Sequence, residues 1–127
     1  MPEFISYNEG DPMIQVRSEG EVTLDQWQRS LERAAQFRDK FGVECLLVDV
    51  RRQWHSAGLK ELFRFANMIP GDLRIAMLVD DLYREHRHGV EEKQRFLEEM
   101  ARQAGKTVKS FLEESEAKDW LLSPEKQ

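Results

Sequence analysis

The chain has 127 residues, is 40% hydrophobic and contains three Trp and seven Phe, a composition that argues against a disordered chain and suffices for one folded core. Its net charge, 19 − 24 = −5, disfavours general binding to nucleic acid or to a membrane surface. The single cysteine excludes an internal disulfide, and no apolar run approaches the length of a membrane span. We therefore expect residues 1–127 to form a single cytoplasmic domain, frayed at 123–127, with no signal peptide and no integral membrane association.

The first half of the chain predicts a hairpin followed by a helix. Residues 4–7 and 13–18 are rich in β-formers and are separated by the turn-forming segment NEGDP, which is typical of a β-hairpin. Thr23 and Gln26 then form the pattern of a capping box at a helix start, and Gly42 suits the helix end. The apolar positions between them recur at helical spacing: Leu24, Trp27, Leu31, Ala34, Phe37 and Phe41.

The middle of the chain predicts two buried strands on either side of a helix. Residues 44–50 and 73–79 are apolar almost without alternation, as expected for central strands covered on both faces. The helix between them ends at Pro70-Gly71. We expect its inward stripe to comprise Leu59, Leu62, Phe63, Ala66 and Ile69.

The last part predicts a polar connection and three further elements. The connection, residues 80–89, leads into a helix that Gly105 closes, with Val90, Leu97, Met100, Ala101 and Ala104 facing inward. A strand over 106–112 and a short helix over 115–122 follow. The order is β-β-α-β-α-β-α-β-α, which implies a mixed, mainly parallel sheet with helices packed on it, an α/β fold.

Four motifs in this order resemble the SpoIIAA-like (STAS/SEC14 domain) group of small bacterial proteins. They span nearly the whole chain: GEVTLDQW at the first helix start, LLVDVR and RIAMLVDD in the central strands, and Phe111 followed by EAKDWLL. The resemblance implies the STAS fold. The close group is not tied to one activity, so the resemblance implies no reaction.

In anti-sigma-factor antagonists of that fold, a serine after the central strand is phosphorylated by a partner kinase. Ser56 corresponds to that serine, and Gly58-Leu59 match the pattern, whereas His55 and Ala57 depart from it. Ser56 is therefore a candidate phosphosite. The simpler interpretation is a helix N-cap, whose hydroxyl accepts a backbone N–H at the start of the following helix.

Basic and aromatic residues gather in the two connections that follow the central strands, where ligands bind in open α/β sheets. The candidate ligand- or anion-binding residues are Arg51, Arg52, Trp54, His55, Arg84, His86, Arg87 and His88. Surface ion pairs with Asp49, Asp80, Asp81 and Glu85 are the alternative for these arginines.

No residue set dictates a reaction or a cofactor. His86 and His88 are two residues apart, without a Cys pair or HExxH motif to complete a metal site. Nucleophile-elbow, dinucleotide-binding and Walker A motifs are absent, and Cys45 falls within a buried strand, where a thiol is normally inert.

The favoured function is accordingly a non-enzymatic regulatory or binding module for a protein partner or a small anionic or lipophilic ligand. The alternative is a metal-dependent phosphoryl-transfer or hydrolytic enzyme that uses Asp49, Asp80 and the loop histidines. A homodimer is a further possibility, for which the off-stripe residues Phe65 and Phe96 are the only indications.

Overall fold

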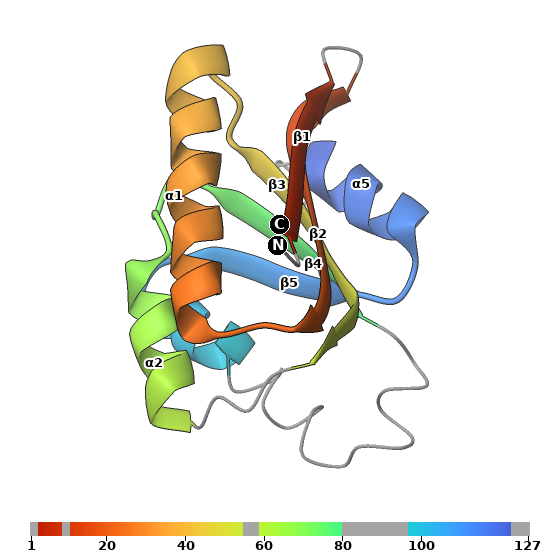
Figure 1. The fold of residues 1–127 in the computed structure, drawn as a ribbon. Coiled ribbons are helices and arrows are strands. Elements are labelled where there is room, and N and C mark those ends of the chain that lie inside the picture. The colour runs from red at the N-terminus through yellow and green to blue at the C-terminus, as the bar shows by residue number, and fades with distance from the viewer. Residues whose placement is uncertain (1–2, 9–10, 55–58, 80–96, 123–127) are drawn as a thin grey trace.

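The computed structural model describes residues 3–8, 11–54, 59–79 and 97–122, which form one five-stranded sheet with helices on both faces (Figure 1). The strand order is β1-β2-β3-β4-β5. The first pair is antiparallel and the other three are parallel, so the predicted mixed, mainly parallel sheet is confirmed. The strands are β1 Glu3–Asn8, β2 Asp11–Glu21, β3 Cys45–Trp54, β4 Arg74–Leu78 and β5 Thr107–Phe111.

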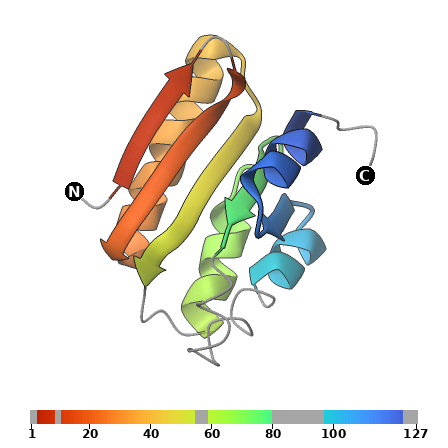
Figure 2. The ribbon, with the colours of Figure 1, turned by 90° about the vertical axis from the view of Figure 1, so that its right-hand side faces the viewer.

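Helices divide unequally between the two faces. Helices α1 (Leu24–Phe41) and α2 (Leu59–Met68) and the helical residues 97–103 pack on one face. Helix α5 (Glu114–Leu122) packs on the other, over β3, β4 and β5. Figure 2 shows that α5 is set to one side of its face, so that no described helix covers β1 and β2 there.

Local signals determine both ends of α1. The backbone N–H of Thr23 donates to Gln26 Oε1 at 2.8 Å, and the N–H of Gln26 donates to Thr23 Oγ1 at 3.3 Å. Gly42 adopts a left-handed φ of 70°, and its N–H donates to the carbonyl of Arg38. The predicted capping box and glycine stop are therefore confirmed.

Each face of the sheet has its own buried cluster. The larger one joins the sheet to α1, α2 and residues 97–103, and Phe37 and Phe65 pack against it. The smaller one lies under α5, whose Ala117 and Leu121 meet Leu47 from the sheet. The continuous apolar runs in β3 and β4 follow from this arrangement, since both strands are covered on both faces.

The inward face of α2 differs from the predicted stripe at one phenylalanine: it contains Phe65 and not Phe63. Phe63 is 51% exposed, whereas Phe65 packs against the core with its ring 5.1 Å from that of Trp27. Leu62, Phe65, Ala66 and Ile69 are spaced as one helical face, and Phe63 lies off it. The assignment of Phe63 to the core was wrong, and so was the use of Phe65 as an indication of a dimer surface. Phe96 lies outside the described residues.

Residues 51–54 were expected to form a loop, and they instead continue strand β3. They extend it because β2 is also longer than predicted and continues to Glu21, so that Arg52 pairs with Glu19 and Trp54 with Glu21. β4 ends opposite Asp49, and the second half of β3 therefore extends past the end of β4. Arg51 and Arg52 thus lie on a strand and not in a connection.

Polar contacts hold the sheet margin and α5 in place. Arg74 of β4 is buried beneath α5 and donates to the carbonyl of Trp120, while the Cys45 thiol donates to the carbonyl of Leu121 at 3.2 Å. On the outer strand β5, the N–H of Ser110 donates to a carboxylate oxygen of Glu98 at 2.5 Å.

Candidate functional site

Few of the predicted site residues belong to the described part of the chain. β3 and β4 are neighbours, as the predicted convergence of the two connections requires. The side chains of Arg51 and Arg52 are described, and Arg52 is exposed. Trp54 ends β3, and its side chain lies outside the description. The remaining predicted residues also lie outside the described residues: His55, Ser56, Asp80, Arg84, His86, Arg87 and His88.

A β-bulge separates the two halves of β3. Between the pairs Arg17–Asp49 and Glu19–Arg52, β2 advances two residues while β3 advances three. The extra residue leaves a backbone N–H without its ladder partner. The side chain of Asp49 accepts the N–H of Arg51 at 3.1 Å, which satisfies the backbone at the irregularity.

The same carboxylate holds the Arg51 side chain. Arg51 Nε donates to Asp49 Oδ1 at 2.9 Å and Nη2 donates to Oδ2 at 2.7 Å, a bidentate pair. Burial opposes ionisation of Asp49. The side-chain and backbone hydrogen bonds from Arg51 and the charges of Arg51 and Arg17 outweigh that effect, and the pKa of Asp49 lies below its ordinary value. Asp49 is therefore ionised at neutral pH.

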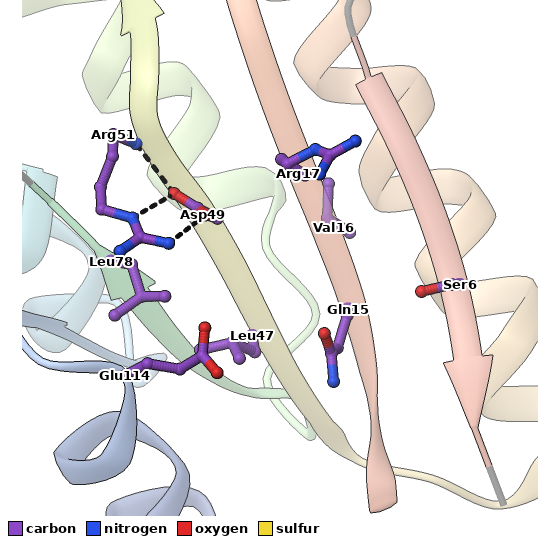
Figure 3. Close-up of a pocket in the computed structure, with 9 residues that line it drawn as sticks. All are labelled: Ser6, Gln15, Val16, Arg17, Leu47, Asp49, Arg51, Leu78 and Glu114. Atoms are coloured by element: carbon purple, nitrogen blue, oxygen red, sulfur yellow. Dashed lines mark hydrogen bonds and ion pairs between the residues drawn. The ribbon is translucent and has the colours of Figure 1, made fainter.

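These residues border a cavity of about 370 Å³ on the sheet face that α5 leaves open (Figure 3). Strands β1, β2, β3 and β4 and the first turn of α5 contribute to it. Figure 3 shows Arg17 and Arg51 toward one end and Glu114, with Leu47 beside it, toward the other. The lining residues are Ser6, Gln15, Val16, Arg17, Leu47, Asp49, Arg51, Leu78 and Glu114.

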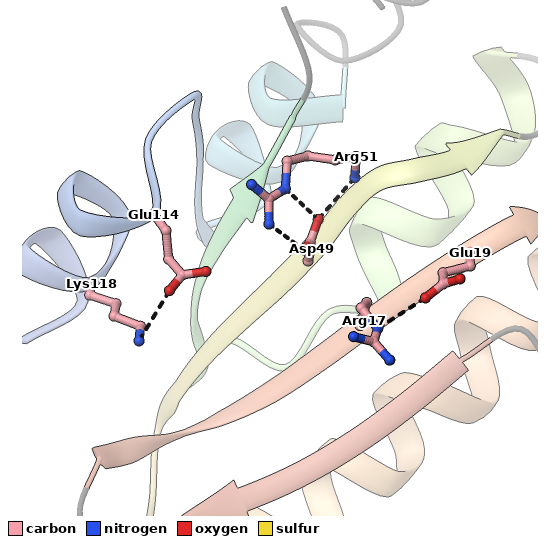
Figure 4. A network of polar contacts seen from close by, with 6 residues as sticks. All are labelled: Arg17, Glu19, Asp49, Arg51, Glu114 and Lys118. Carbon is pink, nitrogen blue, oxygen red and sulfur yellow. Dashed lines mark hydrogen bonds and ion pairs between the residues drawn. The ribbon is translucent and has the colours of Figure 1, made fainter.

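Within the described part of the chain, three ion pairs include a residue that lines the cavity (Figure 4), and each joins residues of a single element. The separations between nitrogen and oxygen are 3.1 Å on β2, 2.7 Å on β3 and 3.3 Å on α5. The pairs are Arg17–Glu19, Arg51–Asp49 and Lys118–Glu114.

The predicted site residues came from the connections after the strands, and they therefore did not include Ser6, Gln15, Arg17 and Glu114. One signal was available. In the segment MIQVRS, Gln15 and Arg17 alternate with apolar residues, and such alternation indicates a strand with one polar face. This alternation did not indicate that the polar face of β2 lies beside β3, the strand that carries Asp49.

The described residues offer little for metal or thiol chemistry. Within residues 3–8, 11–54, 59–79 and 97–122, no three His, Cys, Asp or Glu side chains are grouped as a metal site requires. Burial raises the pKa of the Cys45 thiol, an effect that the charge of Arg74 opposes and that of Glu44 assists. This thiol is thus protonated at neutral pH, when its reactivity is low.

No described helix combines the length and the apolar composition needed to cross a membrane.

Comparison with solved structures supplies a structural relative. No protein-family model and no curated protein matches the sequence. Among solved structures, the chain is similar to an uncharacterized protein of the DUF3478 family from Shewanella loihica PV-4, which has a SpoIIAA-like fold. The match covers 94% of this chain and 91% of the other, with a TM-score of 0.54 and 17% sequence identity. This chain therefore has the SpoIIAA-like fold that its sequence motifs resemble.

Proposed function

We propose that the chain is a non-enzymatic binding module, and that it holds a small ligand with an anionic group in the cavity on the open face of the sheet. The observation that carries the proposal is the position of Arg17 and Arg51, on adjacent strands at one end of that cavity. The planar fork of a guanidinium matches carboxylate and phosphate oxygens.

The size and lining of the cavity suit a small molecule. Its volume of about 370 Å³ falls at the lower end of the range for small-molecule sites, roughly 300–1,000 Å³. Leu47 and Leu78 supply an apolar surface, and the Gln15 amide supplies both a donor and an acceptor. A few polar groups around an apolar surface are the usual composition of a ligand site.

The chemistry of Asp49 favours binding over catalysis. A general acid or base at neutral pH needs a pKa near 7, whereas the pKa of Asp49 is lowered from 3.8. Its carboxylate is occupied by three hydrogen bonds from Arg51. Among the described residues that line the cavity there is neither histidine nor cysteine.

Titration with caproate and with inorganic phosphate, followed by amide NMR spectra, tests the proposal. We expect shifts at Gln15, Leu47 and Asp49, and affinity about tenfold weaker in Arg17→Gln, the loss of one charge-assisted hydrogen bond. Arg33→Gln removes the same charge from the exposed surface of α1, across the sheet, and is expected to bind as the wild type does. Lining residues that stay unshifted with both probes contradict the proposal.

A second candidate, binding of a protein partner through α2, rests on one observation. Phe63 and Met68 of α2 are 51% and 41% exposed, and exposed apolar residues on one helix are common in interaction surfaces. Affinity purification with the wild type, Phe63→Ser and Leu112→Ser tests this candidate. A protein retained by the wild type and by Leu112→Ser, but lost with Phe63→Ser, supports it. Equal retention by all three contradicts it.

Phosphorylation of Ser56, homodimerisation and a cytoplasmic location stay predictions. For Ser56 the measurement is intact mass after incubation with a cognate kinase and ATP, beside a phosphorylated antagonist as a positive control. An unmodified Ser56 in that experiment contradicts the phosphosite.

A further inference from the structure

The two outer strands of the sheet differ at their outer edges. On β5, the backbone N–H of Ser110 donates to the carboxylate of Glu98. On β1, the backbone hydrogen bonds within the described residues are those to β2. Lysine and proline commonly protect such an edge from another strand, and the segment of β1, EFISYN, contains neither. The outer edge of β1 therefore offers backbone N–H and C=O groups to an added strand.

Apolar side chains border this edge on the face of the sheet that carries α1. Ile5 and Tyr7 are half-buried and pack against the core cluster beneath α1. The ring of Tyr7 stacks on that of Phe41 with 4.4 Å between centroids, and Phe41, in the last turn of α1, is 40% exposed. In Figure 2, β1 forms one margin of the sheet, with α1 behind it. Side chains of an added strand can therefore pack beside Ile5 and Tyr7.

We propose that the outer edge of β1 pairs with the same edge of a second copy of the chain, antiparallel and around a two-fold axis that sets Ser6 opposite the partner's Ser6. In this register Ile5 lies opposite the partner's Tyr7, on the face that carries α1. The exposed Ser6 projects from the other face, because alternate residues of a strand point to opposite faces. Ile5, Ser6 and Tyr7 are uncharged, so the pairing of β1 with itself brings no like charges opposite each other at these positions.

Contact between two identical edges ends at two subunits. Each copy contributes the same surface, so the interface is isologous and closed. The alternative, β1 of one copy on β5 of the next, meets a Ser110 N–H that already has a carboxylate partner. A second copy that presents its own β1 is therefore the occupant that the two edges favour.

The pairing extends beyond the proposed function but also affects the ligand cavity. A two-fold axis between antiparallel strands is perpendicular to the sheet, so the two five-stranded sheets become continuous and keep their faces on the same sides. Ser6 lines the cavity. The two cavities thus lie on one face of the dimer, on either side of the paired Ser6 residues.

Sedimentation velocity of the full chain from about 10 µM to about 1 mM tests the dimer. A contact through one strand edge is small, and small interfaces are weak. We expect mostly monomer at the lowest concentration and mostly dimer at the highest, with a Kd on the order of 100 µM. Physiological ionic strength screens the repulsion between two chains of net charge −5. Wild type that stays monomeric up to about 1 mM overturns the proposal, and so do species larger than a dimer.

Opposite charges at Ser6 test the register. In Ser6→Lys and in Ser6→Glu, like charges face each other across the two-fold axis, and each variant alone is expected to dimerise at least about tenfold more weakly than the wild type. An equimolar mixture of the two pairs lysine with glutamate and is expected to recover a dimer. Dimerisation of either variant as strong as that of the wild type overturns the β1 interface. A mixture that dimerises no better than its components overturns the Ser6 register.

Two further measurements separate the interface from general effects. Asn67→Lys adds the same charge at an exposed position of α2 and is expected to dimerise as the wild type does; a loss equal to that of Ser6→Lys contradicts the assignment to β1. Amide hydrogen exchange of the wild type needs no substitution. Protection within Ile5, Ser6 and Tyr7 is expected to rise between about 10 µM and about 1 mM, and protection that is the same at both concentrations overturns the proposal.

Discussion

The guanidinium of Arg74 lies over the indole ring of Trp120, with 3.8 Å between Cζ and the ring centroid. Its Nε and Nη2 also donate to the carbonyl oxygen of Trp120, at 3.1 and 2.7 Å. That carbonyl belongs to the last turn of α5, where carbonyls lack partners within the helix. One side chain of β4 therefore covers the aromatic ring and caps the helix. The placement of α5, and with it of Glu114, depends on this contact.

Replacing Arg74 by methionine is expected to lower the free energy of unfolding by about 2–3 kcal/mol. The variant keeps an apolar stem but leaves the Trp120 carbonyl without its charged donor, which is worth about 1.5–3 kcal/mol. Urea denaturation measures the change. Arg33→Met, at an exposed position of α1, is the control and is expected to change stability by no more than about 0.5 kcal/mol. Equal effects of the two substitutions contradict the role of Arg74.

Asp49→Asn is expected to destabilise the protein at neutral pH by about 1–2 kcal/mol, because a half-exposed charged pair and a bulge hydrogen bond are weakened. The pKa of Asp49 in the fold is below its ordinary value of 3.8. Ionised Asp49 thus stabilises the fold above pH 3.8, and the contribution disappears as the pH falls through the folded pKa.

The corresponding measurement is the difference in unfolding free energy between wild type and Asp49→Asn at neutral pH and at pH values below 4. The difference is expected to shrink on acidification. A difference that is constant over this range shows that the Asp49 carboxylate does not contribute through its charge.

Two phenylalanines of α2 provide a matched pair. Phe65→Ala is expected to cost about 2–4 kcal/mol, because a ring packed against the core and Trp27 is removed. Phe63→Ala is expected to cost no more than about 0.5 kcal/mol, since the Phe63 ring is largely in water. Chemical denaturation of both variants measures the ratio, and a larger loss for Phe63→Ala means that α2 is rotated from the described orientation.

Ser18 of β2 is 1% exposed, and its hydroxyl has no hydrogen-bond partner in the part of the chain that is described. A buried hydroxyl without a partner costs about 1–3 kcal/mol. Ser18→Ala is therefore expected to leave the melting temperature unchanged or to raise it. The exposed Ser6 of β1 supplies the comparison, through Ser6→Ala. A fall in melting temperature in Ser18→Ala alone indicates that the hydroxyl is satisfied.

Elements with local signals could be predicted from the sequence. Thr23, Gln26 and Gly42 determine the ends of α1 through contacts within a few residues, and continuous apolar runs mark β3 and β4 because both strands are covered on both faces. The inward face of α2 was predicted wrongly at Phe63, because Phe63 and Phe65 are equally apolar. Contact with Trp27 of α1 distinguishes them, and that contact joins distant parts of the chain.

The candidate site was harder to predict for the same reason. The segment RRQW is polar and reads as a loop, but the pairing of Arg52 and Trp54 with β2 makes it a strand. The cavity joins Ser6, Gln15 and Glu114 from three separate elements. No local pattern shows that they share one face, because that depends on strand order and on the side position of α5.

The hydrogen bond from the N–H of Ser110 to Glu98 has a consequence for aggregation. β5 is the last strand of the sheet, and an outer strand edge is a template on which another chain can add a strand and begin a fibril. Here an incoming strand has to displace a carboxylate from the backbone N–H and bury or expel its charge. Glu98 thereby raises the barrier to edge-to-edge stacking at high protein concentration.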